Sequence, residues 1–132
     1  MRSSARWNMT PVIDHGTIWL ANLNPGKGTE PGKMRPVLVL QDQALLDAGH
    51  PSTIIIPLTT NLIDDAEPLR IRVKARDLLV KDSDLLIDQI RAIDNRRLTS
   101  GPIATLDPEL MQKIHHAVLE VTGIGPAFDS RV

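Results

Sequence analysis

The sequence contains no cysteine among its 132 residues, which excludes disulfide bonds, thiolate catalysis and zinc sites built from cysteine. Aromatic residues are also scarce: there are two tryptophans, one phenylalanine and no tyrosine. The core must therefore be aliphatic, and stacking of nucleic-acid bases on aromatic side chains is largely unavailable. Because the formal net charge is -1, binding to nucleic acid would have to depend on a local basic patch.

Long hydrophobic runs are missing as well. No stretch approaches the length of a membrane-spanning helix, and the first residues lack the apolar segment of a signal peptide. We therefore expect a cytoplasmic protein without membrane contact, and the lack of cysteine fits a reducing compartment. The length and the hydrophobic content of 42% suit a single globular domain.

Residues 24–36, NPGKGTEPGKMRP, collect glycines, lysines and prolines ahead of an apolar run. They do not match the phosphate-binding pattern G-x-x-x-x-G-K-[ST], because Lys27 stands at the first glycine position and Met34 at the magnesium-binding hydroxyl. A loop of that kind also opens a helix, and nothing after Met34 predicts one. Nucleotide triphosphate chemistry is therefore not expected, and the basic residues of this loop need another explanation.

Short segments rich in β-branched residues dominate the chain. We predict strands at residues 16–23, 36–40, 52–60, 68–76, 84–94 and 101–106, with one helical turn within 42–50. Pro57 indicates that the third strand has an edge, an end or a bulge at that point, since proline cannot donate to a β-ladder.

One strong helix is predicted near the C-terminus. Asp107 is expected to cap it, Pro108 occupies its first turn and Gly123 ends it. An apolar stripe at helical spacing runs along it through Leu110, Ile114, Ala117, Val118 and Val121. Several short strands before one terminal helix predict a small, strongly bent antiparallel barrel closed by that helix. We expect this domain over residues 13–123, between a flexible arm at 1–12 and a tail at 124–132.

The histidines do not suggest a catalytic or metal site. His15 and His50 fall in predicted turns, whereas His115 and His116 are helix neighbours about 100° apart that cannot face one site together. No spacing among them matches a metal-ligand pattern. Surface or capping roles are the favoured interpretation for all four.

The basic residues of segment 70–76 and the single residue Arg35 each allow two interpretations. Residues 70–76 alternate apolar and basic residues, and their basic face is either a phosphate-tracking stripe or, as we favour, the solvated side of an edge strand. Arg35 precedes Pro36 at the start of a buried strand, so its guanidinium could bind phosphate in bidentate fashion. It could equally bond carbonyl groups of the loop, and the spacing leaves both alternatives open.

Other polar residues are candidates for a site. Thr59 and Thr60 end a strand, where their hydroxyls could serve a site or cap the turn before Asn61. Asp88 and Gln89 stand in an otherwise apolar strand and need partners if they are buried. These residues by themselves do not define a reaction.

Four motifs, taken in order, resemble the MazF/PemK (Kid) toxins of bacterial toxin-antitoxin systems. They are G-x-I-W, the P-x-x-G-x-E-x-x-x-x-R-P pattern of residues 25–36, P-L-T-T, and D-Q-I-R, and the resemblance runs from about residue 14 to residue 123. It implies a small SH3-like barrel with a C-terminal helix, acting as a homodimer. The implied activity is sequence-specific cleavage of single-stranded RNA such as mRNA, without metal or cofactor, leaving 2′,3′-cyclic phosphate and 5′-hydroxyl ends. A cognate antitoxin with an acidic, flexible tail is the implied protein partner.

The resemblance also assigns roles to residues. It matches the family's catalytic arginine to Arg35, its strand-end threonine to Thr59 and an aspartate used by some members to Asp88. Arg35 would stabilise charge on phosphorus, Thr59 would position the reacting groups, and Asp88 could accept the 2′-hydroxyl proton. The residues expected to bind RNA are Lys27, Thr29, Glu30, Lys33, Thr60, Gln89 and Arg91.

The sequence departs from the family pattern in its acid-base partners. Thr29 stands close to where some members carry a histidine, and Leu86 stands where one branch has a second arginine. An N-terminal arm that includes Trp7 is also atypical. A gyrase poison of the CcdB kind is disfavoured, because the closing FDSRV lacks the tryptophan-glycine-isoleucine tail of those toxins. A non-catalytic RNA-binding barrel is the other alternative.

Overall fold

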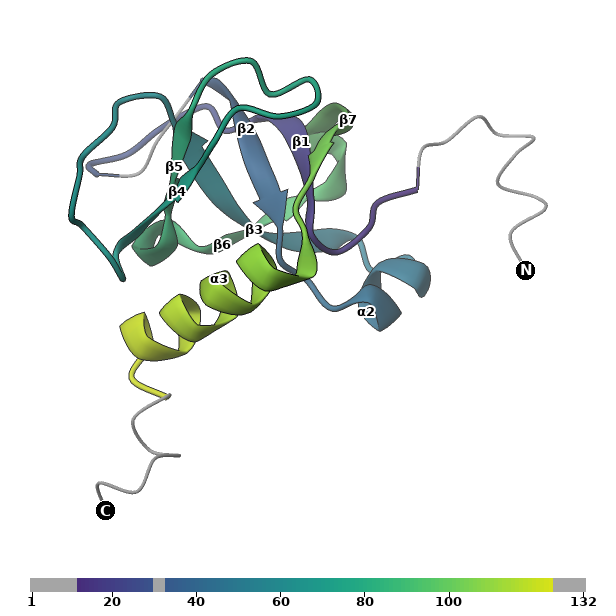
Figure 1. Ribbon diagram of the computed structural model, residues 1–132. Helices are drawn as coiled ribbons and strands as arrows, with labels where there is room; N and C mark the ends of the chain where they lie inside the picture. The colour runs from purple at the N-terminus through teal and green to yellow at the C-terminus, as the bar shows by residue number, and fades with distance from the viewer. Residues whose placement is uncertain (1–11, 30–32, 125–132) are drawn as a thin grey trace.

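The structure is a computed structural model that describes residues 12–29 and 33–124. Residues 1–11 of the arm predicted at 1–12, Glu30, and residues 125–132 of the tail predicted at 124–132 lie outside the described residues. The elements in chain order are β1 (Thr17–Asn22), β2 (Met34–Val39), α2 (Gln43–Asp47), β3 (Ser52–Thr59), β4 (Arg70–Val73), β5 (Ser83–Leu86), η1 (Ile87–Gln89), β6 (Arg91–Asp94), η2 (Asn95–Arg97), β7 (Leu98–Thr105) and α3 (Pro108–Val121) (Figure 1).

The strands form one antiparallel sheet in the order β4-β5-β3-β2-β1-β7, with β6 also paired to β3. β3 is long enough to have two neighbours on one side: Ser52–Ile55 pair with β6, whereas Leu58 and Thr59 pair with β5. Pro57 falls between these two sets. Of the edge, end or bulge that Pro57 allowed, the simple edge does not apply, because the missing N–H falls at the irregularity where β3 changes partner inside the sheet.

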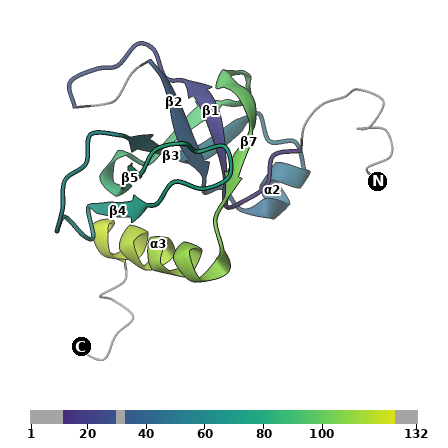
Figure 2. The same ribbon diagram turned by 45° about the horizontal axis from the view of Figure 1, so that its top comes forward.

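The predicted class, mainly β with a C-terminal helix, is confirmed, but the sheet is not closed into a barrel. Within the described residues its path ends at β4 and β7. Helix α3 lies across the sheet instead (Figures 1 and 2), and its Met111, Ile114 and Ala117 join the main core. The predicted apolar stripe therefore covers the sheet as a packed layer, as a one-sided helix must.

The core is aliphatic, as the composition predicts. One cluster, centred on residues such as Ile18, Leu38 and Ile56, lies under α3. A second cluster gathers residues such as Trp19, Val37 and Val39 on the other face of β1 and β2. Residues 37–39 are fully buried, which confirms the expectation that this strand is covered on both faces.

The strand predicted at 84–94 is broken in the structure into β5, η1 and β6. Leu85 pairs with Leu58 and Arg91 pairs with Ile55, so six residues on this segment correspond to three on β3. The three surplus residues coil into η1. Local sequence pattern could not show this, because the break follows from where each half pairs on β3.

Helix α3 begins at Pro108, and Asp107 occupies the N-cap position. The expected capping bond is not formed by its side chain, which instead lies 3.9 Å from Nη1 of Arg76. The backbone N–H of Gly123, at a φ of 79°, bonds the carbonyl of Glu120 just past the helix end, as predicted for this glycine. Among the described helices, none is long and apolar enough to cross a membrane.

Candidate functional site

Arg35 and Thr59 lie at the same end of two paired strands. β2 begins at Met34 and β3 ends at Thr59, and Val37 pairs with Pro57. Arg35 stands two residues before Val37 and Thr59 two residues after Pro57, so both residues, each half-buried, lie at this end of the β2–β3 pair.

The hydroxyl of Thr59 also supports the turn that follows β3. Its Oγ1 accepts a hydrogen bond of 3.1 Å from the backbone N–H of Asn61. The two alternatives considered for Thr59, a site residue or a turn cap, are therefore compatible, because accepting this bond does not use the donor of the hydroxyl. Thr60, next in the chain, is exposed.

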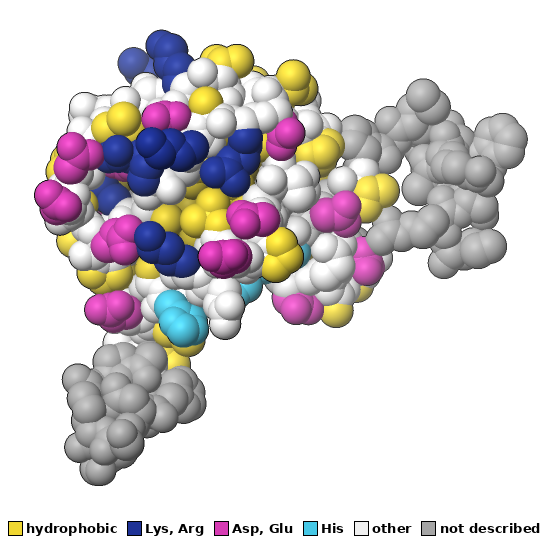
Figure 3. All heavy atoms as spheres, in the orientation of Figure 1, with side chains coloured by type: hydrophobic (Ala, Val, Ile, Leu, Met, Phe, Trp, Pro, Cys, Tyr) yellow, Lys and Arg dark blue, Asp and Glu magenta, His cyan; other side chains and the backbone are white. Residues whose placement is uncertain are grey.

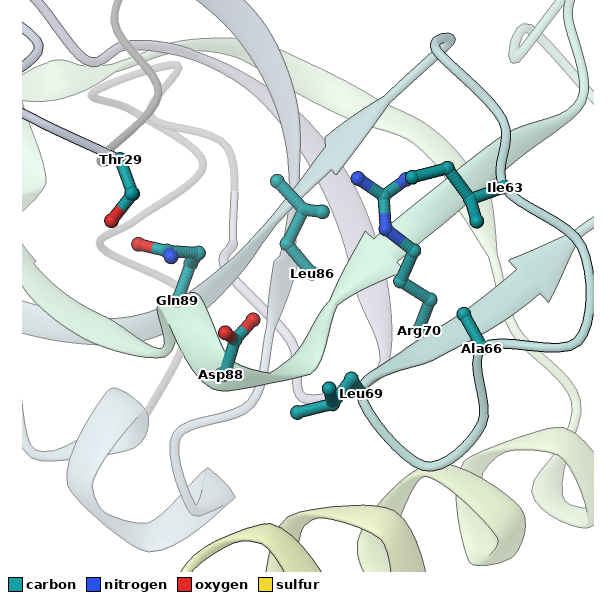
Figure 4. A pocket seen from close by; sticks show the side chains of 8 residues that line it. All are labelled: Thr29, Ile63, Ala66, Leu69, Arg70, Leu86, Asp88 and Gln89. Carbon is teal, nitrogen blue, oxygen red and sulfur yellow. The ribbon is translucent and has the colours of Figure 1, made fainter.

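The described part of the chain also forms a cavity of about 380 Å³. It is lined by Thr29, Ile63, Ala66, Leu69, Arg70, Leu86, Asp88 and Gln89 (Figure 4). The loop after β1, the loop between β3 and β4, and the β5–η1 junction all contribute to its wall. Arg35 and Thr59 are not among its lining residues.

The cavity joins three of the residues predicted for the site. Gln89 extends toward Thr29, and Asp88 projects from η1 into the same space (Figure 4). Asp88 is exposed and Gln89 is half-buried, so neither is the buried polar strand residue that was considered. Arg70 and Leu86 face this cavity too, and the register pairs them directly across β4 and β5. Their place at the site was not predicted.

Asp84 fastens the loop between β3 and β4. Its side chain is 1% exposed and accepts hydrogen bonds from the backbone N–H of Ile63 (2.9 Å), Nη1 of Arg70 (3.2 Å) and Nε of Arg72 (2.5 Å). Burial raises the pKa of Asp84, but the bonds from Arg72, Ile63 and Arg70 outweigh it, so the pKa lies below its ordinary value. One sequence signal could have revealed the bonds around Asp84. Asp84 is a carboxylate in an apolar strand, and an earlier strand carries arginines at alternate positions.

The basic face of 70–76 is neither a free stripe nor merely solvated. Arg72 binds Asp84 and, at 2.9 Å, Asp64. Arg76 donates to the carbonyl of Lys74 at 3.0 Å. β4 does end the sheet, as favoured, but Arg70 and Arg72 are half-buried in ion pairs. Figure 3 shows basic and acidic side chains interspersed on the face of the molecule that it displays.

The base of the 24–36 loop is held by an arginine distant in sequence. Nη1 of Arg97 donates to the carbonyls of Asn22 (3.1 Å) and Asn24 (2.7 Å). Lys33 closes the loop with a backbone N–H bond of 2.6 Å to the side chain of Asn24. Lys27 and Lys33 are both exposed, as RNA contacts would have to be.

Arg91 is half-buried on β6, and its Nη1 is buried without a hydrogen-bond partner in the described part of the chain. A buried donor left unpaired costs about 1–3 kcal/mol. The RNA-binding role of Arg91 stays a prediction.

The structure brings together His15 and His115, a contact that the sequence did not predict. Nε2 of His15 lies 3.2 Å from Nε2 of His115, while Nδ1 of His15 faces the carbonyls of Leu40 and Gln41 at 3.0 and 3.1 Å. Burial, followed by the charges of His15 and His116, lowers the pKa of His115. Over residues 12–29 and 33–124, no three side chains of the metal-binding types come together to hold an ion.

Comparison with known proteins identifies the family. Residues 14–122 match the family described as PemK-like, MazF-like toxin of type II toxin-antitoxin system. Endoribonuclease EndoA of Bacillus subtilis is 34% identical over 111 residues, which cover 81% of this chain and 91% of that protein. This chain therefore belongs to the PemK-like, MazF-like toxins, and the resemblance found in the four motifs is confirmed.

Solved structures share the fold. MazF from Deinococcus radiodurans superposes with a TM-score of 0.72 at 24% identity, covering 86% of this chain and 99% of that one. A mycobacterial endoribonuclease solved in complex with its cognate antitoxin has a TM-score of 0.66 at 19% identity, covering 87% of this chain and 97% of that one. At these identities the likeness establishes the architecture alone.

Proposed function

We propose that this toxin is an endoribonuclease that cuts single-stranded RNA such as mRNA. The observation that carries the proposal is the 34% identity to an endoribonuclease over most of both chains. The geometry adds a cation, Arg35, and a hydroxyl, Thr59, at the same end of β2 and β3, and a cavity that Asp88 and Gln89 line. A cation and a positioning hydroxyl suit chemistry at a phosphodiester.

The reaction we propose is attack by a ribose 2′-hydroxyl on the adjacent phosphorus. The 2′-oxygen forms a bond to phosphorus and loses its proton, while the bond from phosphorus to the 5′-oxygen breaks and that oxygen gains a proton. The products are a 2′,3′-cyclic phosphate and a 5′-hydroxyl end. No metal ion or cofactor is required for this displacement.

Each predicted residue has one part in this reaction. Arg35 stabilises the negative charge that gathers on the phosphate oxygens, and it keeps its own proton throughout. Thr59 holds a phosphate oxygen or the attacking hydroxyl in line. Asp88, exposed on η1 beside the cavity, accepts the 2′-hydroxyl proton.

The RNA strand and the protein partners follow from the same proposal. Lys27, Thr29, Lys33, Gln89 and Arg91 contact the strand around the cleavage site, together with Thr60 and Glu30. The toxin works in the cytoplasm as a homodimer, and a cognate antitoxin inhibits it by laying an acidic, flexible tail over the RNA-binding surface. Solved complexes of related toxins with their antitoxins support the expectation of such a partner.

The test is cleavage of a long RNA in EDTA, followed by mapping of the 5′-hydroxyl ends. We expect the wild type to cut at a recurring sequence and Arg35→Ala to lose about 10²- to 10³-fold in rate. Arg96→Ala is the matched control, because Arg96 is exposed and, among the described residues, its side chain pairs only with its near neighbour Asp94. Intact RNA with the wild type, or equal cleavage by Arg35→Ala, would overturn the proposal.

A further inference from the structure

Arg70 brings a positive charge to the cavity from β4, which lies outside the four family motifs. It begins β4, faces Leu86 across the β4–β5 pair and lines the cavity together with Asp88 and Gln89. Its side chain is 20% exposed, so it is largely enclosed yet still reachable. Figure 4 shows the guanidinium standing between Leu86 and Ile63, over the same space into which Asp88 projects.

The guanidinium of Arg70 is oriented through one nitrogen. Nη1 donates to Oδ2 of Asp84 at 3.2 Å and to the carbonyl of Asn61 at 2.9 Å. An arginine has five N–H groups in a planar fork, and these two bonds use the two on Nη1. The bonds therefore hold the plane of the fork without using the N–H groups of Nε and Nη2, a pre-organised arrangement for an anionic oxygen.

The other basic residues of this face are arranged differently. Arg72 commits Nε to Asp84 and Nη2 to Asp64, so both outer edges of its fork are occupied. Arg76 turns toward the carbonyl of Lys74 and toward Asp107. Lys74 is exposed and lines neither this cavity nor its neighbour. Among these four, Arg70 alone lines the cavity that holds Asp88.

Acidic residues restrict the direction from which an anion can reach Arg70. Arg70 also lines a second hollow, whose other lining residues include Asp64, Asp65 and Glu67. Like charge there repels a phosphate, whereas the cavity side presents Thr29, Gln89 and the single carboxylate of Asp88. The strand would therefore be admitted on one side of the guanidinium only.

We infer that Arg70 binds a phosphate of the RNA strand in this cavity, held in orientation by Asp84 and the carbonyl of Asn61. The inference rests on the proposed function for its ligand, but it concerns binding rather than the cleavage step. It divides the basic face of 70–76 into one ligand-binding arginine and neighbours that serve the fold.

The experiment measures binding of a short, mixed-sequence single-stranded RNA in which every ribose is 2′-O-methylated, so that 2′-hydroxyl attack is impossible. Fluorescence anisotropy gives the affinity at several salt concentrations for the wild type, Arg70→Gln, Arg70→Lys and Lys74→Gln. Lys74→Gln removes the same charge from the same face at an exposed position and is the matched control. Thermal melts show whether each variant is folded.

For Arg70→Gln we expect binding to weaken about tenfold, as loss of one charge-assisted hydrogen bond gives. The slope of log affinity against log salt should fall by about 0.7, the value for one phosphate contact on a single strand. Arg70→Lys should keep the slope and lose affinity, because a lysine has charge without the planar fork. Lys74→Gln should leave both quantities close to wild type.

The inference would be overturned if Arg70→Gln left the slope of log affinity against log salt unchanged. It would also be overturned if Lys74→Gln lowered the affinity as much as Arg70→Gln does, since that result indicates a diffuse basic face. If Arg70→Gln does not fold, Arg70→Lys decides: wild-type affinity in that variant rejects the inference. A wild type that cuts RNA while Arg70→Gln binds normally rejects only the role of Arg70. Arg70-dependent binding without cleavage rejects only the proposed nuclease, and no binding by the wild type rejects both.

Discussion

Replacement of Gly101 by alanine should destabilise the fold through one contact. A Cβ atom at Gly101 would lie 2.4 Å from Cδ2, 2.7 Å from Cγ and 2.8 Å from Cε3 of Trp19. Carbon atoms pack at about 3.5–4.0 Å, so the indole ring would have to move by about 1 Å. Trp19 is 4% exposed within the second core cluster, and its Nε1 donates to Oγ1 of Thr17 at 3.2 Å. A ring held on both sides cannot move without disturbing its neighbours.

We expect Gly101→Ala to lower the free energy of unfolding by about 1–3 kcal/mol, the range for overpacking a well-filled core. For a domain of this size that corresponds to a fall of roughly 4–12 °C in Tm. Calorimetry or circular dichroism measures it, with Ser100→Ala, an exposed neighbour on β7, as the control.

A double-mutant cycle with Trp19→Leu identifies the cause. The smaller side chain should make room for the methyl group, so Gly101→Ala should cost much less in that background, with a coupling of about 1 kcal/mol or more. A Tm for Gly101→Ala equal to that of the wild type, or an identical loss in both backgrounds, would refute the steric explanation.

The other predictions concern buried charge and pH. Val39→Asp should lose at least about 3 kcal/mol of stability, because Val39 is fully buried and the new carboxylate has no partner; a wild-type melt would contradict this. The folded state lowers the pKa of His115, so the contribution of this histidine to stability is fully present above the ordinary histidine pKa and is lost as pH falls through the folded pKa. The Tm of the wild type should therefore fall in mild acid. The fall should be smaller in His115→Gln than in the His116→Gln control. Asp84→Asn should lower the free energy of unfolding by about 3 kcal/mol at neutral pH, because the lowered pKa of Asp84 stabilises the fold above the ordinary aspartate pKa. Below that pKa, the free energy of unfolding should depend less on pH in the variant than in the wild type. Denaturant unfolding at several pH values tests both effects.

The parts of the fold that could be predicted from the sequence are those that local pattern controls. β-forming residues located β1 and apolar alternation located β4 within their predicted segments, and helical spacing with Pro108 and Gly123 located α3. Pattern failed at η1, because that break arises from the different registers of β5 and β6 on β3. At Pro57 it left an edge, an end or a bulge open for the same reason, because the strands that pair with β3 lie elsewhere in the chain.

The same distinction holds for the site. The sequence by itself determined the family, through four ordered motifs, and with it the candidates Arg35, Thr59 and Asp88. Only the tertiary structure placed Arg70 over the cavity, fastened it to Asp84 fourteen residues away and brought His15 to His115. Motifs record residues whose identity is constrained along the chain, whereas these contacts join side chains whose proximity depends on strand pairing and helix packing. The contact between Arg70 and Asp84, which lie on different strands, can be identified only when the pairing of those strands is known.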